Sequence, residues 1–183
     1  MISLLSGLHG GTLRNVLMKP RLSTILILLL VSQTSLADFN DGVVAFMSGD
    51  HEKALSVFVP LAETTDHAYA QYFVGRMYAA GQGVDKNSQA AAKWYRKASE
   101  LGVADAQFRL GDLYQNGDGV PRDMESAYGW YRVAAHLGNP KAIAAVERSA
   151  GLLSPAEFQE AEILSSELIE KYGTTPKTTA RTQ

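Results

Sequence analysis

The chain has 183 residues, 46% of them hydrophobic, with 17 basic residues, 19 acidic residues and no cysteine. This length and hydrophobic content are sufficient for one continuous core but hardly for two domains. Residues 38–183 hold 14 basic and 19 acidic residues. This mildly acidic body, without basic clusters, argues against nucleic acid as the main ligand, and the lack of cysteine excludes a disulfide framework and a thiolate metal site.

The first 37 residues have the pattern of a signal peptide. Lys19 and Arg21 supply positive charge, residues 22–31 form an apolar stretch, and small residues occupy the −3 and −1 positions of a cleavage site that ends at Ala37. The apolar stretch is shorter than the ~20 residues of a membrane span, which makes an uncleaved signal anchor the weaker alternative. We expect cleavage after Ala37, a periplasmic or secreted protein without a stable membrane span, and translation that starts at the first residue or at Met18.

Residues 38–66 predict a degenerate first repeat. Its glycines, Ala54 and Phe58 follow the spacing Gly-x6-Gly-Asp-x3-Ala-x3-Phe, which resembles a tetratricopeptide repeat. An atypical unit is expected at the end of a repeat array, because its outer face has no neighbour. Asp66 is of a residue type that caps helices and is predicted to cap the next one.

Residues 67–138 contain one 36-residue unit written twice, as 67–102 and 103–138. When residues 70–102 are laid over 106–138, 14 of 33 positions are identical. A period of roughly 20 to 50 residues is typical of arrays in which each unit buries its apolar face against its neighbours. The sequence therefore predicts a repeat architecture.

Each unit is predicted to be two helices around a glycine turn. In the first unit, Ala70, Val74 and Met77 recur at helical spacing, and Gly-Gln-Gly-Val follows at residues 81–84. Asn87 is placed to cap the second helix, and Asp123 has the same position in the next unit. A glycine inside each first helix, at positions 75 and 111, indicates close approach of a partner helix.

The two tryptophans, Trp94 and Trp130, occupy the same position in the two units. Repetition at the unit period indicates that they belong to the core between helices rather than to a ligand box. Truncation of either to alanine is predicted to cost roughly 3 to 5 kcal/mol.

The pattern Ala-Gln-x-x-Val/Leu-Gly-x-x-Tyr-x-x-Gly-x-Gly-Val, followed by Ala-x-x-Trp-Tyr-Arg-x-Ala and Leu-Gly, closely resembles the Sel-1-like repeat, a relative of the tetratricopeptide repeat. The resemblance is strong over 67–138 and extends, with degenerate units, over 38–172. It implies an all-α fold, an α-solenoid of helix-turn-helix repeats that binds proteins or peptides and has no chemistry of its own.

Residues 139–173 are predicted to be a partial repeat and a capping helix. Asn139 and Pro140 begin a helix in phase with the repeat, but no further glycine turn follows. Ser154 and Glu157 form a capping box for a final helix that seals the array. The polar tail, residues 174–183, is expected to be disordered.

No pattern of residues predicts catalysis. The histidines lack metal-ligand spacing, no Gly-x-Ser-x-Gly motif is present, and the Gly-x-Gly turns lack the third glycine of a dinucleotide site. We therefore expect no cofactor, no metal and no enzyme activity. Two alternatives remain: a hydrolase of cell-wall or β-lactam substrates, and a structural protein that self-associates through its end repeats.

The leading hypothesis is an exported adaptor that binds a partner protein or peptide along the concave face of the first helices. Aromatic, arginine and amide side chains on rigid helices suit such recognition. The candidate partner-binding residues are Tyr69, Tyr72 and Arg76 in one unit and Phe108, Asp112, Gln115 and Asn116 in the next. The alternative is that Tyr72 and Phe108 pack between units and that the polar residues are simply solvated.

Overall fold

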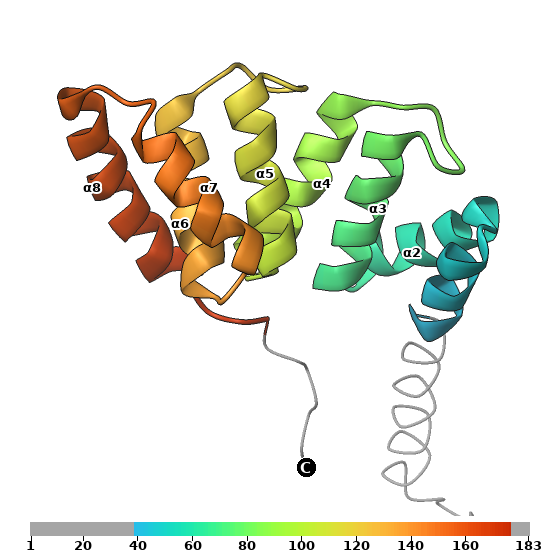
Figure 1. Cartoon of the computed structure of the whole chain (residues 1–183). Helices are drawn as coiled ribbons and strands as arrows, with labels where there is room; N and C mark the ends of the chain where they lie inside the picture. The colour runs from blue at the N-terminus through green and yellow to red at the C-terminus, as the bar shows by residue number, and fades with distance from the viewer. Residues whose placement is uncertain (1–38, 177–183) are drawn as a thin grey trace, which may run out of the picture. The chain divides into compact units, whose positions relative to one another are not determined.

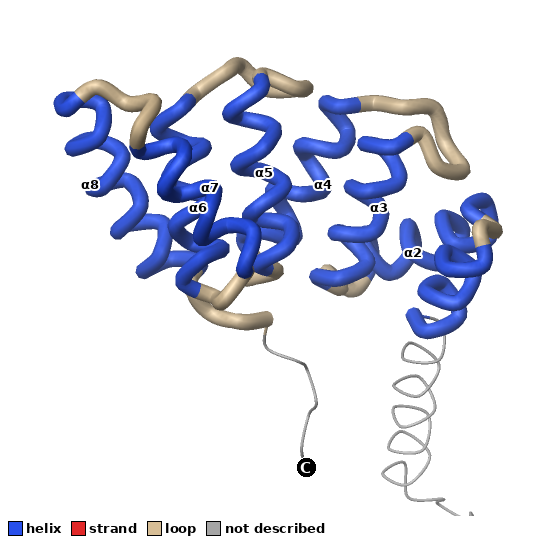
Figure 2. Tube along the Cα trace, in the orientation of Figure 1, coloured by secondary structure: helices blue, strands red, loops and turns tan. Residues whose placement is uncertain are grey.

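The structure, a computed structural model, describes residues 39–176. The predicted signal peptide and the last seven residues of the predicted tail lie outside this range. Within it, all regular secondary structure is α-helical. Residues 39–48 are helical and are followed by α2 (His51–Thr64), α3 (Ala68–Ala80), α4 (Ser88–Glu100), α5 (Ala104–Asn116), α6 (Met124–His136), α7 (Pro140–Ala150) and α8 (Pro155–Tyr172) (Figures 1 and 2).

Helices that are consecutive in the chain pack against each other from α2 to α7. Figure 1 shows them standing side by side as a row of antiparallel helices, with the glycine turns between α3 and α4 and between α5 and α6 at one edge. This arrangement confirms the predicted α-solenoid of helix-turn-helix units.

Capping residues set the beginnings of the helices. The side chains of Asn87 and Asp123 accept hydrogen bonds of 2.9 and 3.0 Å from backbone N–H groups in the first turns of α4 and α6, as predicted. The prediction for α3 was wrong by one residue. His67, not Asp66, is the N-cap, and its Nδ1 accepts a bond of 3.2 Å from the N–H of Ala70. Asp66 instead has a left-handed φ of 49°, which belongs to the turn.

The glycines inside the first helices allow each second helix to approach closely. A Cβ atom on Gly75 would lie 2.8 Å from Cδ1 of Tyr95, and one on Gly111 would lie 2.6 Å from Cε1 of Tyr131. Neither distance is compatible with a side chain at the glycine position, which confirms the predicted close packing.

α8 packs against α6 and makes little contact with α7. Gly129 on α6 permits this approach, because a Cβ atom on this residue would lie only 3.0 Å from Cδ1 of Leu168. The indole of Trp130 stacks on the ring of Tyr172, with centroids 5.6 Å apart. The C-terminal helix thus covers the outer side of the second repeat.

The two tryptophans are therefore not equivalent. Trp130 is 4% exposed, whereas Trp94 is only partly buried and packs at the edge of the N-terminal cluster. We therefore expect truncation to cost less at Trp94 than at Trp130, because α8 covers α6 and none of the described helices covers the matching side of α4 in this way.

Candidate functional site

The candidate residues lie on the first helices of the units, α3 and α5. Tyr72, Arg76, Arg109 and Asp112 form a row of partly exposed side chains along these two helices, which we call the first-helix face. The side chains of this face interact through charge, because Arg76 and Arg109 each act to lower the pKa of Tyr72. From α7, the charge of Arg148 acts on Asp112 and lowers the pKa of that carboxyl.

Arg76 is held by aromatic rings. Its guanidinium carbon lies 4.9 Å from the ring centre of Phe46, 5.6 Å from that of Phe73 and 5.7 Å from that of Tyr72. Such cation–π contacts fix a guanidinium without neutralising its charge. Within residues 39–176, no carboxylate lies within ion-pair distance of Arg76. Its positive charge is therefore oriented and available to an anionic group of a ligand.

Tyr72 lies next to Arg76 and is half-buried. Its ring packs edge-on against Phe73 at 5.7 Å and lies 6.0 Å from Tyr95. Burial raises the pKa of the Tyr72 hydroxyl, and the negative charge of Asp105 raises it further, while the neighbouring arginines oppose the shift. The hydroxyl therefore stays protonated and can both donate and accept a hydrogen bond.

Asp112 is tied into the repeat itself. The hydroxyl of Tyr131 on α6 donates a hydrogen bond of 2.9 Å to Asp112 and approaches the side-chain oxygen of Gln115 at 3.3 Å. Nη1 of Arg109 pairs with the same carboxylate at 3.3 Å. Burial nevertheless raises the pKa of Asp112, and the contacts with Tyr131 and Arg109 offset this only in part.

The other candidate residues are placed differently. Phe108 is 9% exposed and its ring packs 5.7 Å from that of Tyr131, so it belongs to the core rather than to an open surface. Tyr69 is 47% exposed at the start of α3, and Asn116 is exposed at the end of α5. Gln115 is half-buried, and its backbone carbonyl accepts a bond of 3.0 Å from Arg122.

Sequence reasoning missed Arg109, Phe46 and Arg148. Arg109 stands three residues before Asp112 on one helix, a spacing at which opposite charges meet, and this signal was available in the sequence. Phe46 lies outside the clear repeats, and its contact with Arg76 depends on how the helical residues 39–48 pack against α3. No local sequence pattern predicts such a contact between distant segments.

Two further observations concern chemistry and membranes. Among residues 39–176, no group of three or more histidine, aspartate and glutamate side chains is arranged to hold a metal ion. None of the helices in the same range combines the length and apolar character needed to cross a bilayer.

Comparison with known proteins identifies the repeats. The Sel1 repeat model matches residues 68–103 and 104–139. A protective antigen of uropathogenic Escherichia coli strains that displays an SLR fold is 34% identical, with a TM-score of 0.72, over 76% of this chain and 30% of that one. A Sel1 repeat protein from Oxalobacter formigenes is 30% identical, with a TM-score of 0.58, over 71% and 55% of the two chains. No curated protein matches the chain.

This chain therefore spans less than two thirds of the length of either solved structure.

Proposed function

We propose that this chain, which carries two Sel1 repeats, is a non-catalytic adaptor that binds a partner protein or extended peptide on its first-helix face. Sel1-repeat proteins are generally protein-interaction scaffolds, and the SLR fold is typically not catalytic. A scaffold needs preorganised side chains on rigid elements, because immobilising a flexible side chain on binding costs about 0.5 to 1.5 kcal/mol.

Arg76 is the observation that carries the proposal. Three rings, that of Tyr72 among them, orient its guanidinium, and no carboxylate of residues 39–176 neutralises it. A carboxylate of the partner, from an acidic side chain or a chain end, fits the charge of Arg76. An apolar or aromatic neighbour in the partner fits the exposed part of the Tyr72 ring.

Affinity capture tests this function. The tagged protein serves as bait for an envelope fraction of its host, beside an Arg76→Glu variant and a Lys93→Glu variant. Lys93 is an exposed lysine on α4, so its reversal changes the net charge equally at a different surface. We expect one partner to be retained by the wild type and by Lys93→Glu and lost by Arg76→Glu. Identical capture by all three proteins would refute the assignment.

We further propose that the adaptor acts in the bacterial periplasm or outside the cell, within an envelope system. The support is the sequence of the first 37 residues, in which Lys19 and Arg21 precede an apolar stretch and small residues precede position 38. Production of the full chain in a bacterial host, followed by fractionation and intact-mass measurement, tests this. A cytoplasmic product that retains these residues contradicts the proposal, and a mature protein that begins at Asp38 supports it.

A further inference from the structure

The first helix of the third unit, α7, lacks the partner that the other first helices have. α3 packs against α4 and α5 packs against α6, each first helix against the second helix of its own unit. α8 follows α7 in the chain, but it packs against α6 and makes little contact with α7. One side of α7 is therefore left without the second helix that the repeat would place there.

The repeat period identifies that side of α7. In the second unit, α5 buries a stripe of residues, and the ring of Tyr131 of α6 lies against one of them, Gly111. Three such residues are Gln107, Leu110 and Gly111, and the residues 36 positions later are Ile143, Val146 and Glu147. In α7 these positions face a groove instead of a helix.

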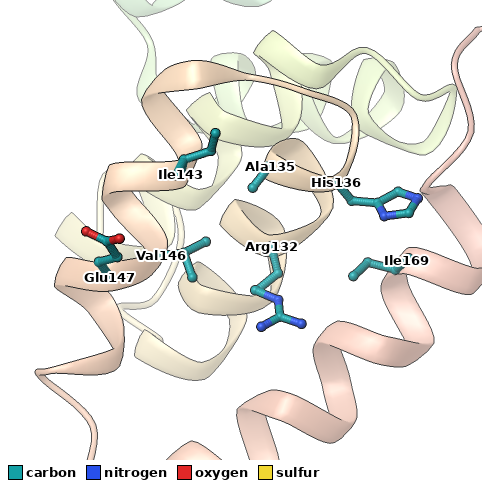
Figure 3. A pocket seen from close by; sticks show the side chains of 7 residues that line it. All are labelled: Arg132, Ala135, His136, Ile143, Val146, Glu147 and Ile169. Carbon is teal, nitrogen blue, oxygen red and sulfur yellow. The ribbon is translucent and has the colours of Figure 1, made fainter.

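The groove, which we call the α7 groove, has a volume of about 320 Å³. The groove is lined by Ile143, Val146 and Glu147 from α7, by Arg132, Ala135 and His136 from α6, and by Ile169 from α8. Figure 3 shows Ile143 and Val146 on one side and Ile169 on the other, with Arg132 between them. Ile143 is 53% exposed, which is unusual for a branched aliphatic side chain whose repeat equivalents are buried.

We propose that the α7 groove binds a basic amphipathic helix of a partner protein, which takes the place of the missing second helix. A groove flanked by two helices and lined by aliphatic side chains suits an apolar helix face, read at positions i, i+3, i+4 and i+7. α7 has 11 residues, so a partner helix of about three turns matches its length at about 1.5 Å per residue.

Charge sets the polar side of the partner helix. α7 and α8 together carry six glutamates and three basic residues. Glu147 lines the groove, and Arg132 at its base is already paired with Glu162 at 3.0 Å. Glu147 also replaces the glycine that receives a tyrosine ring in the first two units. The occupant therefore differs from α4 and α6 and carries lysine or arginine opposite Glu147.

The two terminal helices of the described part of the chain do not meet this description. α8 is itself rich in glutamate, and the helical residues 39–48, which expose Val44 and Met47, contain no basic residue. A second copy that docked through either of these helices would thus bring like charge or no charge to Glu147. The charge pattern favours a different protein as the partner.

A synthetic helix tests the proposal. The probe is a fluorescein-labelled, hydrocarbon-stapled peptide of about 15 residues, made of leucine, alanine and lysine with leucine at i, i+3, i+4 and i+7, because unstapled helices of this length are marginal in water. Its scrambled isomer and a version with glutamate for lysine are the controls. We expect fluorescence anisotropy to give a dissociation constant at or below about 100 μM for the first peptide and at least tenfold weaker binding of the others.

Variants of the protein locate the binding. Ile143→Asp changes a groove residue, and Ile163→Asp is its matched control, an isoleucine of α8 that is 63% exposed and does not line the groove. We expect Ile143→Asp to weaken binding by at least about tenfold and Ile163→Asp to leave it within about twofold. Glu147→Lys should lower the affinity for the lysine peptide and raise it for the glutamate peptide.

Three results would overturn the proposal: equal binding of the scrambled isomer, equal effects of the two isoleucine variants, or no binding of the helical peptide at about 100 μM. Sedimentation of the wild type checks for a second copy in the groove. A concentration-dependent dimer that Ile143→Asp abolishes would assign the groove to self-association and refute a separate partner. None of these results depends on Arg76, so they are distinct from the test of the first-helix face.

Discussion

Gly111 of α5 lies against the ring of Tyr131 of α6, so close that a Cβ atom would be 2.6 Å from Cε1 and 2.7 Å from Cδ1. The ring has no room to retreat, because Tyr131 is buried and its hydroxyl is bonded to Asp112. We therefore expect Gly111→Ala to lower the free energy of unfolding by roughly 1 to 3 kcal/mol, the usual cost of overpacking. Urea denaturation followed by circular dichroism measures this change.

Gly129→Ala is the matched control for this substitution. A Cβ there would come within 3.0 Å only of Cδ1 of Leu168, the end of a flexible side chain, and other contacts lie at 3.6 Å or beyond. Alanine also favours the helix over glycine by about 1 kcal/mol. We expect the unfolding free energy to change by less than about 1 kcal/mol. Equal losses at the two positions would show that close approach to Tyr131 is not what requires Gly111.

Trp130→Ala should be more destabilising than Trp94→Ala, although the two residues are repeat equivalents. Trp130 is buried and stacks on Tyr172, so its loss creates a cavity and weakens the docking of α8. We expect a cost of roughly 3 to 5 kcal/mol for Trp130 and about half as much for the partly exposed Trp94. Hydrogen exchange provides a second measurement, with loss of protection in α8 only for the Trp130 variant.

These contrasts show which features the sequence could predict. Features that are local, or that recur in each unit, were predicted from spacing. They are the glycine turns, the caps at Asn87 and Asp123, and the close approach at Gly75. The position of α8 was not, because it depends on a contact between Gly129 and Leu168, residues far apart in the chain. Identical residues such as the two tryptophans then acquire different environments from a helix that the repeat does not encode.

The candidate partner-binding residues also differ in how well the sequence predicted their surroundings. Tyr72 and Arg76 were selected by helical counting, and both lie partly exposed on α3. Phe108 occupies the position equivalent to Tyr72 but is buried against Tyr131. The rings around Arg76 include Phe46, from a unit whose sequence is too degenerate to align. The repeat thus predicts on which face of its helix a side chain lies more reliably than it predicts how exposed that side chain is.

Gln107→Leu should loosen the C-terminal end of α8. The Gln107 side chain is fully buried, and its amide nitrogen donates to the carbonyls of Ser99 at 3.0 Å and Tyr172 at 3.1 Å. Leucine fills similar space but leaves the Tyr172 carbonyl without this donor, whereas the Ser99 carbonyl still accepts a bond of 3.0 Å from the N–H of Gly102. A polar group left unsatisfied costs roughly 1 to 3 kcal/mol. We expect a loss of that size in urea denaturation.

Hydrogen exchange separates this effect from a general loss of stability. The equivalent residue, Gln71, donates to the carbonyl of Ala62 and does not contact α8. Gln71→Leu should therefore increase exchange around α2 and α3, and Gln107→Leu around the end of α8. Increased exchange at the end of α8 in both variants would contradict a specific role for Gln107.

Asp112→Asn should not destabilise the protein at neutral pH. Because burial raises the pKa of Asp112, the folded state binds its proton more tightly than the unfolded state does, and ionisation costs stability. This cost is absent below the unfolded pKa, grows as pH rises towards the folded pKa, and is complete above it.

Asparagine avoids the cost and still offers an oxygen to the Tyr131 hydroxyl, whose bond to Asp112 is 2.9 Å long. Urea denaturation from pH 3 to pH 7 should give a variant at least as stable as the wild type at pH 7, with any advantage shrinking as the pH falls. A wild type that is clearly more stable at pH 7, by a margin that disappears in acid, would mean that the ion pair with Arg109 outweighs burial.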